Sequence, residues 1–164
     1  MAELQPPESS TDAGGVATDL PDGPTVLFDG KCNLCNGSIQ FVLDHERAPD
    51  LRFAPLQSNV ARALLERAFG PDAAEALVRG ATGSGDPDGL VVIEGARGWT
   101  HSDAALHIAR YLRAPYRWLV AFAIVPRGLR DLVYRWIAKN RYRWFGKTET
   151  CRVPSPDLRA RFLA

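Results

Sequence analysis

The sequence predicts an α/β fold: a mixed β-sheet with helices on both faces, followed by a C-terminal helical extension. Two observations support this prediction. The apolar residues change between strand and helix spacing in the order β-α-β-α-α-β-β-α, and two more helices follow. An opening β-α-β unit gives a parallel strand pair, whereas the later β-β hairpin gives an antiparallel pair, so one sheet contains both.

Four short runs, bounded by turn residues, predict the strands. The runs are 25–28, 51–54, 90–94 and 97–100. The first is continuously apolar after its threonine, which is typical of a buried strand. The last two are separated only by Gly95-Ala96, which is the spacing of a tight hairpin turn.

Apolar positions at helical spacing predict the helices. The expected ranges are 32–46, 57–69, 72–78, 102–113, 118–125 and 128–145, with one more helical turn in the tail. Ser102 is the expected N-cap of the fourth helix, because a serine side chain accepts a hydrogen bond from a first-turn N–H. The 118–125 segment is apolar on all sides, which favours a buried or interfacial helix.

Length and composition favour one domain. The chain has 164 residues, of which 46% are hydrophobic and 24% charged, as in ordinary globular proteins. Residues 1–24 hold five acidic residues and no basic ones, so we expect a disordered acidic leader without the features of a signal peptide. Residues 25–164 then form a single domain, with the added helices at 115–164.

The cysteine count and the apolar runs predict a cytoplasmic protein. The three cysteines are Cys32, Cys35 and Cys151, too few for a disulfide-rich scaffold, and their odd number favours a reducing compartment. The longest apolar run, 118–125, has eight residues. A transmembrane helix needs about 20, so no transmembrane segment is expected.

Cys32 and Cys35 are the candidate redox pair. Thiols at this spacing can close a small disulfide ring, and the positive end of a helix dipole favours the thiolate that attacks disulfides. We expect Cys32, beside Lys31, to be the exposed nucleophile and Cys35 the resolving thiol. The alternatives are two buried structural cysteines or half of a metal site, although Cys151 has no neighbouring ligand to complete such a site.

Asp29 precedes the pair. Its carboxylate could exchange a proton with the buried thiol or orient the turn at Gly30-Lys31. The simpler alternative is a turn-forming Asp-Gly pair. A carboxylate close to a thiolate raises the pKa of the thiol and so opposes the helix dipole.

A Cys-x-x-Cys pair after the first strand of this element order is the thioredoxin-like or glutaredoxin-like plan. The chain also resembles the DCC family of thiol-disulfide oxidoreductase-like proteins, whose Asp-x-x-Cys-x-x-Cys motif is matched by Asp29, Cys32 and Cys35. The resemblance covers about residues 25–163 through further blocks: Leu51-Arg52-Phe53-Ala54-Pro55-Leu56-Gln57, Ser102-Asp103-Ala104, Pro126, Tyr134, Asn140-Arg141-Tyr142 and Cys151-Arg152. It implies a thioredoxin-like fold and oxidoreductase activity, but no substrate.

The segment from the hairpin to Ser102 and Asp103 resembles the glutaredoxin region that holds the carboxylate and amine of glutathione. Lys31, Ser102 and Asp103 are therefore candidate substrate-binding residues, although plain N-capping explains Ser102 equally simply. Thioredoxin-like proteins also carry a cis-proline just before this hairpin. Pro87 is the only candidate here, and it is slightly out of register.

The C-terminal part is basic and aromatic. Residues 110–152 hold eleven Lys or Arg residues against two acids. One interpretation is contact of helix 128–145 with an acidic partner or an anionic membrane surface. The other is that Trp136 and Trp144 pack on the core beneath arginine stems. No motif for reading nucleic acid is present.

The sequence therefore predicts a thiol-disulfide oxidoreductase that acts on protein or small-molecule disulfides. Glutathione or a thioredoxin-type thiol would donate the electrons, and no nucleotide-binding glycine motif implies a flavin or nicotinamide cofactor. No metal site is predicted. The alternative is a non-catalytic binding module for an acidic partner or anionic membrane surface, with structural or metal-bound cysteines.

Overall fold

The computed structural model describes residues 20–81, 89–147 and 156–163. Its strands are β1 (Thr25–Phe28), β2 (Arg52–Pro55), β3 (Leu90–Glu94) and β4 (Arg97–Thr100). They form one sheet in the order β2-β1-β3-β4. β1 pairs with β2 in parallel and with β3 in antiparallel, and β3 and β4 form the hairpin. The prediction of a mixed sheet is confirmed.

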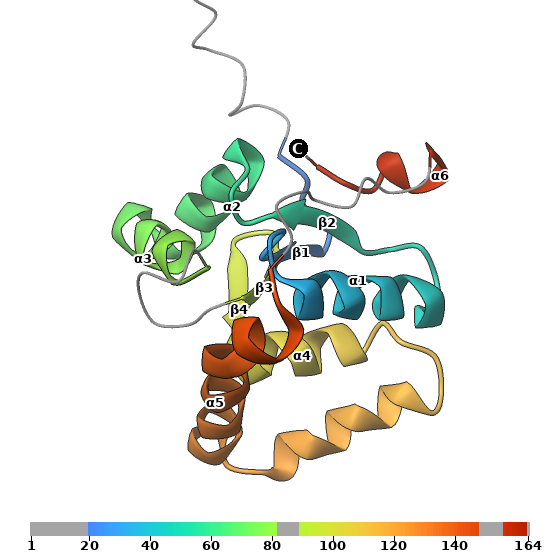
Figure 1. Ribbon diagram of the computed structural model, residues 1–164. Helices are drawn as coiled ribbons and strands as arrows, with labels where there is room; N and C mark the ends of the chain where they lie inside the picture. The colour runs from blue at the N-terminus through green and yellow to red at the C-terminus, as the bar shows by residue number, and fades with distance from the viewer. Residues whose placement is uncertain (1–19, 82–88, 148–155, 164) are drawn as a thin grey trace, which may run out of the picture.

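In chain order, the helices of the described residues are α1 (Asn33–His45), α2 (Asn59–Phe69), α3 (Pro71–Ala81), α4 (His101–Ala109), the 3₁₀-helix η1 (Tyr116–Ile124), α5 (Arg127–Phe145) and α6 (Pro156–Arg159). α1 and α4 cover one face of the sheet, and α2 and α3 cover the other (Figure 1). This mixed α/β arrangement is consistent with a thioredoxin-like fold.

The core divides into two layers because successive strand residues point to opposite faces. Val26, Phe28 and Val92 pack with α1 and α4. Leu27 and Ile93 pack with α2 and α3 on the other face. Because every residue of β1 is buried, its continuous apolar run is the pattern expected of a strand covered on both sides.

Segments at both ends of the described chain form hydrogen bonds with the body of the domain. The backbone of Phe53 in β2 bonds with Arg161 and Leu163, each at 2.8 Å. Near the other end, the Pro21 carbonyl and the Asp22 carboxylate accept hydrogen bonds from Arg67 of α2. Residues 20–24, which the sequence placed in the acidic leader, thus contact the domain. Residues 1–19 lie outside the described part.

α5 packs against α4 and the start of α1 with a polar stripe rather than an apolar one. Its fully buried residues are Ala138 and Arg141. Trp136 and Trp144 are 60% and 48% exposed, so the expectation that they pack on the core is wrong. The reason is that ion pairs, described below, hold the other side of α5 against the body.

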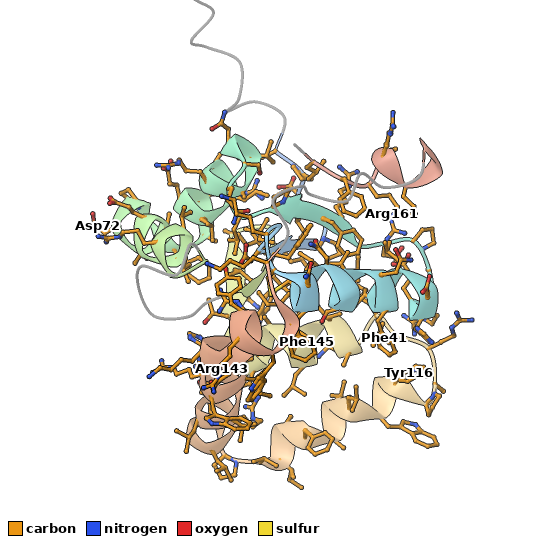
Figure 2. The ribbon with its side chains drawn as sticks, viewed as in Figure 1. Phe41, Asp72, Tyr116, Arg143, Phe145 and Arg161 are labelled. Carbon is orange, nitrogen blue, oxygen red and sulfur yellow. The ribbon has the colours of Figure 1, made fainter. Side chains whose placement is uncertain are left out.

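η1 also differs from the prediction. It lies along α4, but none of its nine residues is buried, so a buried helix is excluded. Tyr116 at its start packs against Phe41 of α1, with ring centroids 4.9 Å apart (Figure 2). None of the helices in the described ranges is both long and apolar enough to cross a lipid bilayer.

Candidate active site

The loop after β1 leads directly into α1, so that the cysteine pair lies at the start of this helix. Asp29 continues the strand pairing through its N–H, which donates to the Gly89 carbonyl at 3.1 Å. Its Oδ1 then accepts from the Lys31 N–H at 3.1 Å, which closes a turn of the kind that Asp favours. Cys32 follows as the N-cap of α1, with extended backbone angles. A cysteine therefore occupies a position usually taken by Ser, Thr or Asp.

The pKa of Cys32 is lowered and that of Cys35 is raised. Hydrogen bonding from the Cys35 side chain is the largest cause that lowers the pKa of Cys32, to about 6. The Cys35 backbone N–H, 3.4 Å from the Cys32 sulfur, and the charge of Arg141 act in the same direction, against burial and Asp29. The pKa of Cys35 is raised, because it is the donor in this pair and is buried beside Asp29. Hydrogen bonding and burial thus separate the pKa values of the two thiols, and that of Cys32 is the lower.

The exposure of the two cysteines is the reverse of what the sequence suggested. Cys32 is fully buried, whereas Cys35 is partly exposed. The chain just after α5 covers Cys32, since Lys147 forms an antiparallel bridge with it. The Asn33 side-chain amide donates to the Phe145 carbonyl at 2.9 Å and helps to hold this segment. We call residues 145–147 the strap.

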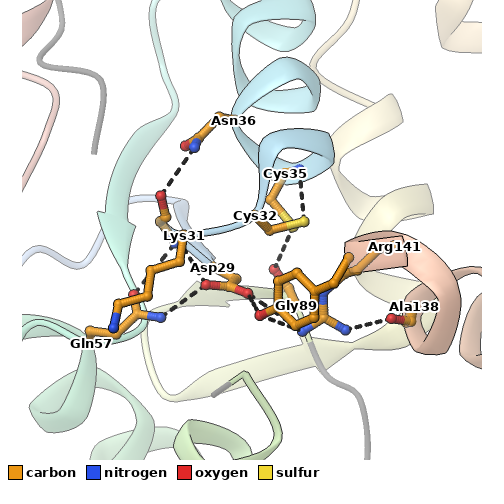
Figure 3. Close-up of polar contacts among 11 residues, drawn as sticks. Asp29, Lys31, Cys32, Cys35, Asn36, Gln57, Gly89, Ala138 and Arg141 are labelled. Atoms are coloured by element: carbon orange, nitrogen blue, oxygen red, sulfur yellow. Dashed lines mark hydrogen bonds and ion pairs between the residues drawn. The ribbon is translucent and has the colours of Figure 1, made fainter. Parts of the chain in front are cut away.

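Asp29 lies at the centre of a buried polar cluster (Figure 3). Oδ1 accepts from Gln57 Nε2 at 3.0 Å as well as from Lys31 N–H. Oδ2 accepts from the Tyr142 hydroxyl and lies 3.5 Å from Nη2 of Arg141. The pKa of Tyr142 is raised by burial and by its hydrogen bond to this carboxylate. Asp29 therefore does far more than form a turn.

Arg141 is the residue that sequence reasoning missed. It comes from α5, far along the chain, yet it is only 3% exposed and lies beside Asp29 and both cysteines. Nη1 donates to the Ala138 carbonyl at 2.7 Å, whereas Nε has no hydrogen-bond partner in the described residues. The Asn140-Arg141-Tyr142 block of the family pattern was the only available signal, and it indicated no role.

Gly89 takes the position that faces the pair just before β3. A Cβ on this residue would lie 3.4 Å from the Cys35 sulfur, so a larger side chain would press on the thiol. The Gly89 carbonyl is 3.8 Å from that sulfur and can accept a weak hydrogen bond from the Cys35 S–H. Pro87, the candidate for the cis-proline position, and Cys151 both lie outside the described residues.

Ser102 and Asp103 lie in a different cluster, at the start of α4. Thr100 is the N-cap, so the expected cap at Ser102 is wrong by two positions. The Ser102 hydroxyl and N–H both donate to Asp131 of α5, and Asp103 pairs with Arg130 at 2.9 Å. The chain's own Asp131 carboxylate thus occupies the place where a ligand carboxylate was expected at this helix start.

Lys31 is exposed at the turn, and its backbone N–H donates to Asp29. Two hollows adjoin the cysteine pair. A pocket of about 120 Å³ is lined by Cys35, Gly89 and Arg141, among others. A larger apolar cleft of about 490 Å³ is lined by residues of α1 and α4, and Asn33, Leu34 and Phe145 of the strap also line it. In the described ranges, no group of three or more His, Cys, Asp or Glu side chains could hold a metal ion.

Two nearby cysteines at a helix start, on a fold consistent with the thioredoxin-like plan, are the arrangement typical of the thiol-disulfide oxidoreductase class. The sequence profile of the DCC1-like thiol-disulfide oxidoreductase family matches residues 26–147. The chain belongs to this family. The match covers β1, the cysteine pair, α5 and the strap, so all parts of the site fall inside it.

Two curated relatives support this assignment. The chain is 43% identical over 144 residues to the uncharacterized protein YuxK of Bacillus subtilis, covering 84% of this chain and 92% of the relative. It is 36% identical over 131 residues to a chloroplastic DCC family protein of Arabidopsis thaliana, At1g52590, covering 79% and 69%. No solved structure matches the chain.

Proposed function

We propose that this protein exchanges disulfides with protein or small-molecule substrates through Cys32 and Cys35. The observation that carries the proposal is the arrangement of Cys32 at the α1 N-cap, where its sulfur accepts the Cys35 N–H and its pKa falls to about 6. At neutral pH the attacking sulfur is therefore mostly thiolate, which is the reactive form in disulfide exchange.

The reduction of a substrate proceeds in two displacements. The Cys32 thiolate attacks one sulfur of the substrate disulfide, forms a mixed disulfide and releases the other sulfur as a thiolate. Cys35 then loses its proton and attacks the Cys32 sulfur, which releases the second substrate thiolate and leaves a Cys32–Cys35 disulfide. Two electrons pass to the substrate, and an external dithiol or glutathione restores the pair.

In this proposal Asp29 takes the proton from Cys35 in the second displacement. The carboxylate is buried, and its charge raises the pKa of both thiols, so it acts on the same site. Gln57, Tyr142 and Arg141 hold its two oxygens in place. An Asp29→Asn variant should keep a reactive Cys32, because the opposing charge is gone, yet accumulate the mixed disulfide.

The burial of Cys32 suggests how a substrate approaches. The strap pairs with Cys32 through a single antiparallel bridge, and an extended substrate segment could replace it at the same backbone groups. The cleft that Phe145 lines would then take apolar side chains beside the disulfide, and Arg141 Nε could donate to a substrate carbonyl. This arrangement favours a disulfide in an extended, partly apolar peptide. Glutathione or a thioredoxin-type protein of the cytoplasm would supply electrons.

The test is alkylation mass spectrometry of the full chain after equilibration in glutathione buffers of graded potential. Cys151→Ser serves as the background, so that only Cys32 and Cys35 can change mass. If the proposal is right, the two thiols disappear together with a single two-electron midpoint, and a Cys35→Ser variant accumulates a Cys32 adduct with glutathione. Thiols that stay alkylatable at every potential would instead make the pair structural and end the proposal.

A further inference from the structure

The exposed side of α5 carries large apolar side chains among the basic residues Arg135, Lys139 and Arg143, and the side facing the body carries charged residues beside Ala138. Arg130, Asp131 and Arg141 make the contacts with α4 and with Asp29. The large apolar side chains of α5 therefore point away from the core, where a soluble domain normally buries them. Leu132, Val133 and Trp136 are 66%, 51% and 60% exposed.

η1 precedes α5 with only Val125 and Pro126 between them, and it too exposes large apolar side chains. Figure 1 shows η1 on the far side of α4 from the sheet, and α5 at the edge of the molecule beside α4. Trp118, Phe122 and Ile124 are 73%, 58% and 91% exposed. We call these six side chains of η1 and α5 the apolar face. Large apolar side chains exposed in this number on two successive helices are typical of a site of interaction.

Positive charge borders the apolar face. Residues 118–125 form an uninterrupted apolar run, with Arg117 directly before it and Arg127 shortly after it. At the start of η1 lies an open depression of about 930 Å³, whose lining includes Arg47, Arg110, Arg113, Arg117 and Trp118. Four guanidinium groups around one hollow favour an anionic group with several oxygens, such as a phosphate.

We propose that the apolar face binds the surface of an anionic lipid bilayer, with η1 lying in the interface and the arginines meeting lipid phosphates. The run of η1 is too short to cross a bilayer, but its length and its flanking arginines suit a helix that lies in the plane of the membrane. Tryptophans at the border of the face are typical of side chains at the depth of the headgroups.

This inference does not depend on the redox proposal, because none of the six side chains belongs to the cysteine site. The test is co-sedimentation of the full chain, kept reduced, with vesicles of equal parts phosphatidylglycerol and phosphatidylcholine. Vesicles of phosphatidylcholine alone are the neutral comparison. We expect binding to the anionic vesicles that weakens as salt rises, and little binding to the neutral ones.

Two variants test the apolar face and the arginines beside it, and each has a matched control on α2 or α3, on the other face of the sheet. Phe122→Asp/Ile124→Asp should weaken binding roughly thirtyfold or more, because two side chains no longer enter the bilayer. Ala73→Asp, an exposed position of α3, should leave it unchanged. Arg117→Glu should weaken binding about tenfold, whereas Arg62→Glu on α2 should not. If the double variant is not folded by circular dichroism, Arg117→Glu decides the question.

Three outcomes overturn the proposal. One is no binding to anionic vesicles at low salt. Another is equal binding by the face variants and their controls. The third is a dimer in analytical ultracentrifugation that dissociates in Phe122→Asp/Ile124→Asp while vesicles are not bound, which would make the face a contact between two copies of this chain.

Discussion

Replacing Arg141 with methionine tests whether the buried ion pair organises the cysteine site. Asp29 has no exposed surface and Arg141 is 3% exposed, with 3.5 Å between Nη2 and Oδ2. Removing one partner of such a pair leaves a buried charge without compensation and costs about 3–5 kcal/mol. Asp29 keeps hydrogen bonds from Gln57, Tyr142 and the Lys31 N–H, so the loss should be near the lower limit, about 3 kcal/mol.

The assay is urea unfolding of the reduced protein, followed by tryptophan fluorescence. Arg143→Met is the matched control, since this exposed arginine is two residues further along the same helix and should change stability by less than about 0.5 kcal/mol. The double variant Asp29→Asn/Arg141→Met should be more stable than the sum of the single changes predicts, because neither charge is then left alone.

Arg141→Met should also raise the pKa of Cys32, because the positive charge of Arg141 lowers it. The pH dependence of Cys32 alkylation reports this shift independently of stability. Two results together would refute the view that this pair holds α5 on the site. One is a loss of less than about 1 kcal/mol in the unfolding free energy of Arg141→Met, and the other is additive effects of Asp29→Asn and Arg141→Met in the double variant.

Three further predictions concern the cysteines. The rate of Cys32 alkylation by iodoacetamide should level off above a midpoint near pH 6, and Cys35→Ala should move that midpoint upward, because the main cause of the low pKa is then lost. Asn33→Ala should speed alkylation of Cys32 at fixed pH by loosening the strap at Phe145; an unchanged rate would mean that the bridge alone holds it. Because the folded pKa of Cys32 is depressed, its thiolate stabilises the reduced fold above the unfolded pKa, and this stability is lost as pH falls through about 6. The stability difference between wild type and Cys32→Ser, from urea unfolding at each pH, should shrink accordingly; a difference that is constant from pH 9 to 5 would contradict the low pKa.

Local patterns were sufficient to predict the strands. β1, β3 and β4 occupy the predicted residues, and β2 is shifted by one position. A continuous apolar run and a two-residue turn act over a few residues, so they can be recognised without knowing the rest of the fold. The parallel pairing of β1 with β2 and the antiparallel pairing of β3 with β4 also followed, because a β-α-β unit and a hairpin each allow few arrangements.

The orientation of α5 could not be predicted in the same way. Its periodicity shows which residues share a side of the helix, and the sequence placed the tryptophans on one side. Which side faces the body depends on partners elsewhere in the chain. Ser102, Asp103 and Asp29 supply those partners, and ion pairs and hydrogen bonds with them turn the polar side inward.

The sequence by itself determined the sheet, the cysteine pair at a helix start and the family, because each depends on short-range spacing or on ordered blocks of residues. Only the tertiary structure decided that Arg141 and Tyr142 reach Asp29, that the strap covers Cys32 and that the apolar side of α5 faces outward. These contacts join residues more than a hundred positions apart. No local pattern encodes them, since they depend on how complete helices are placed against one another.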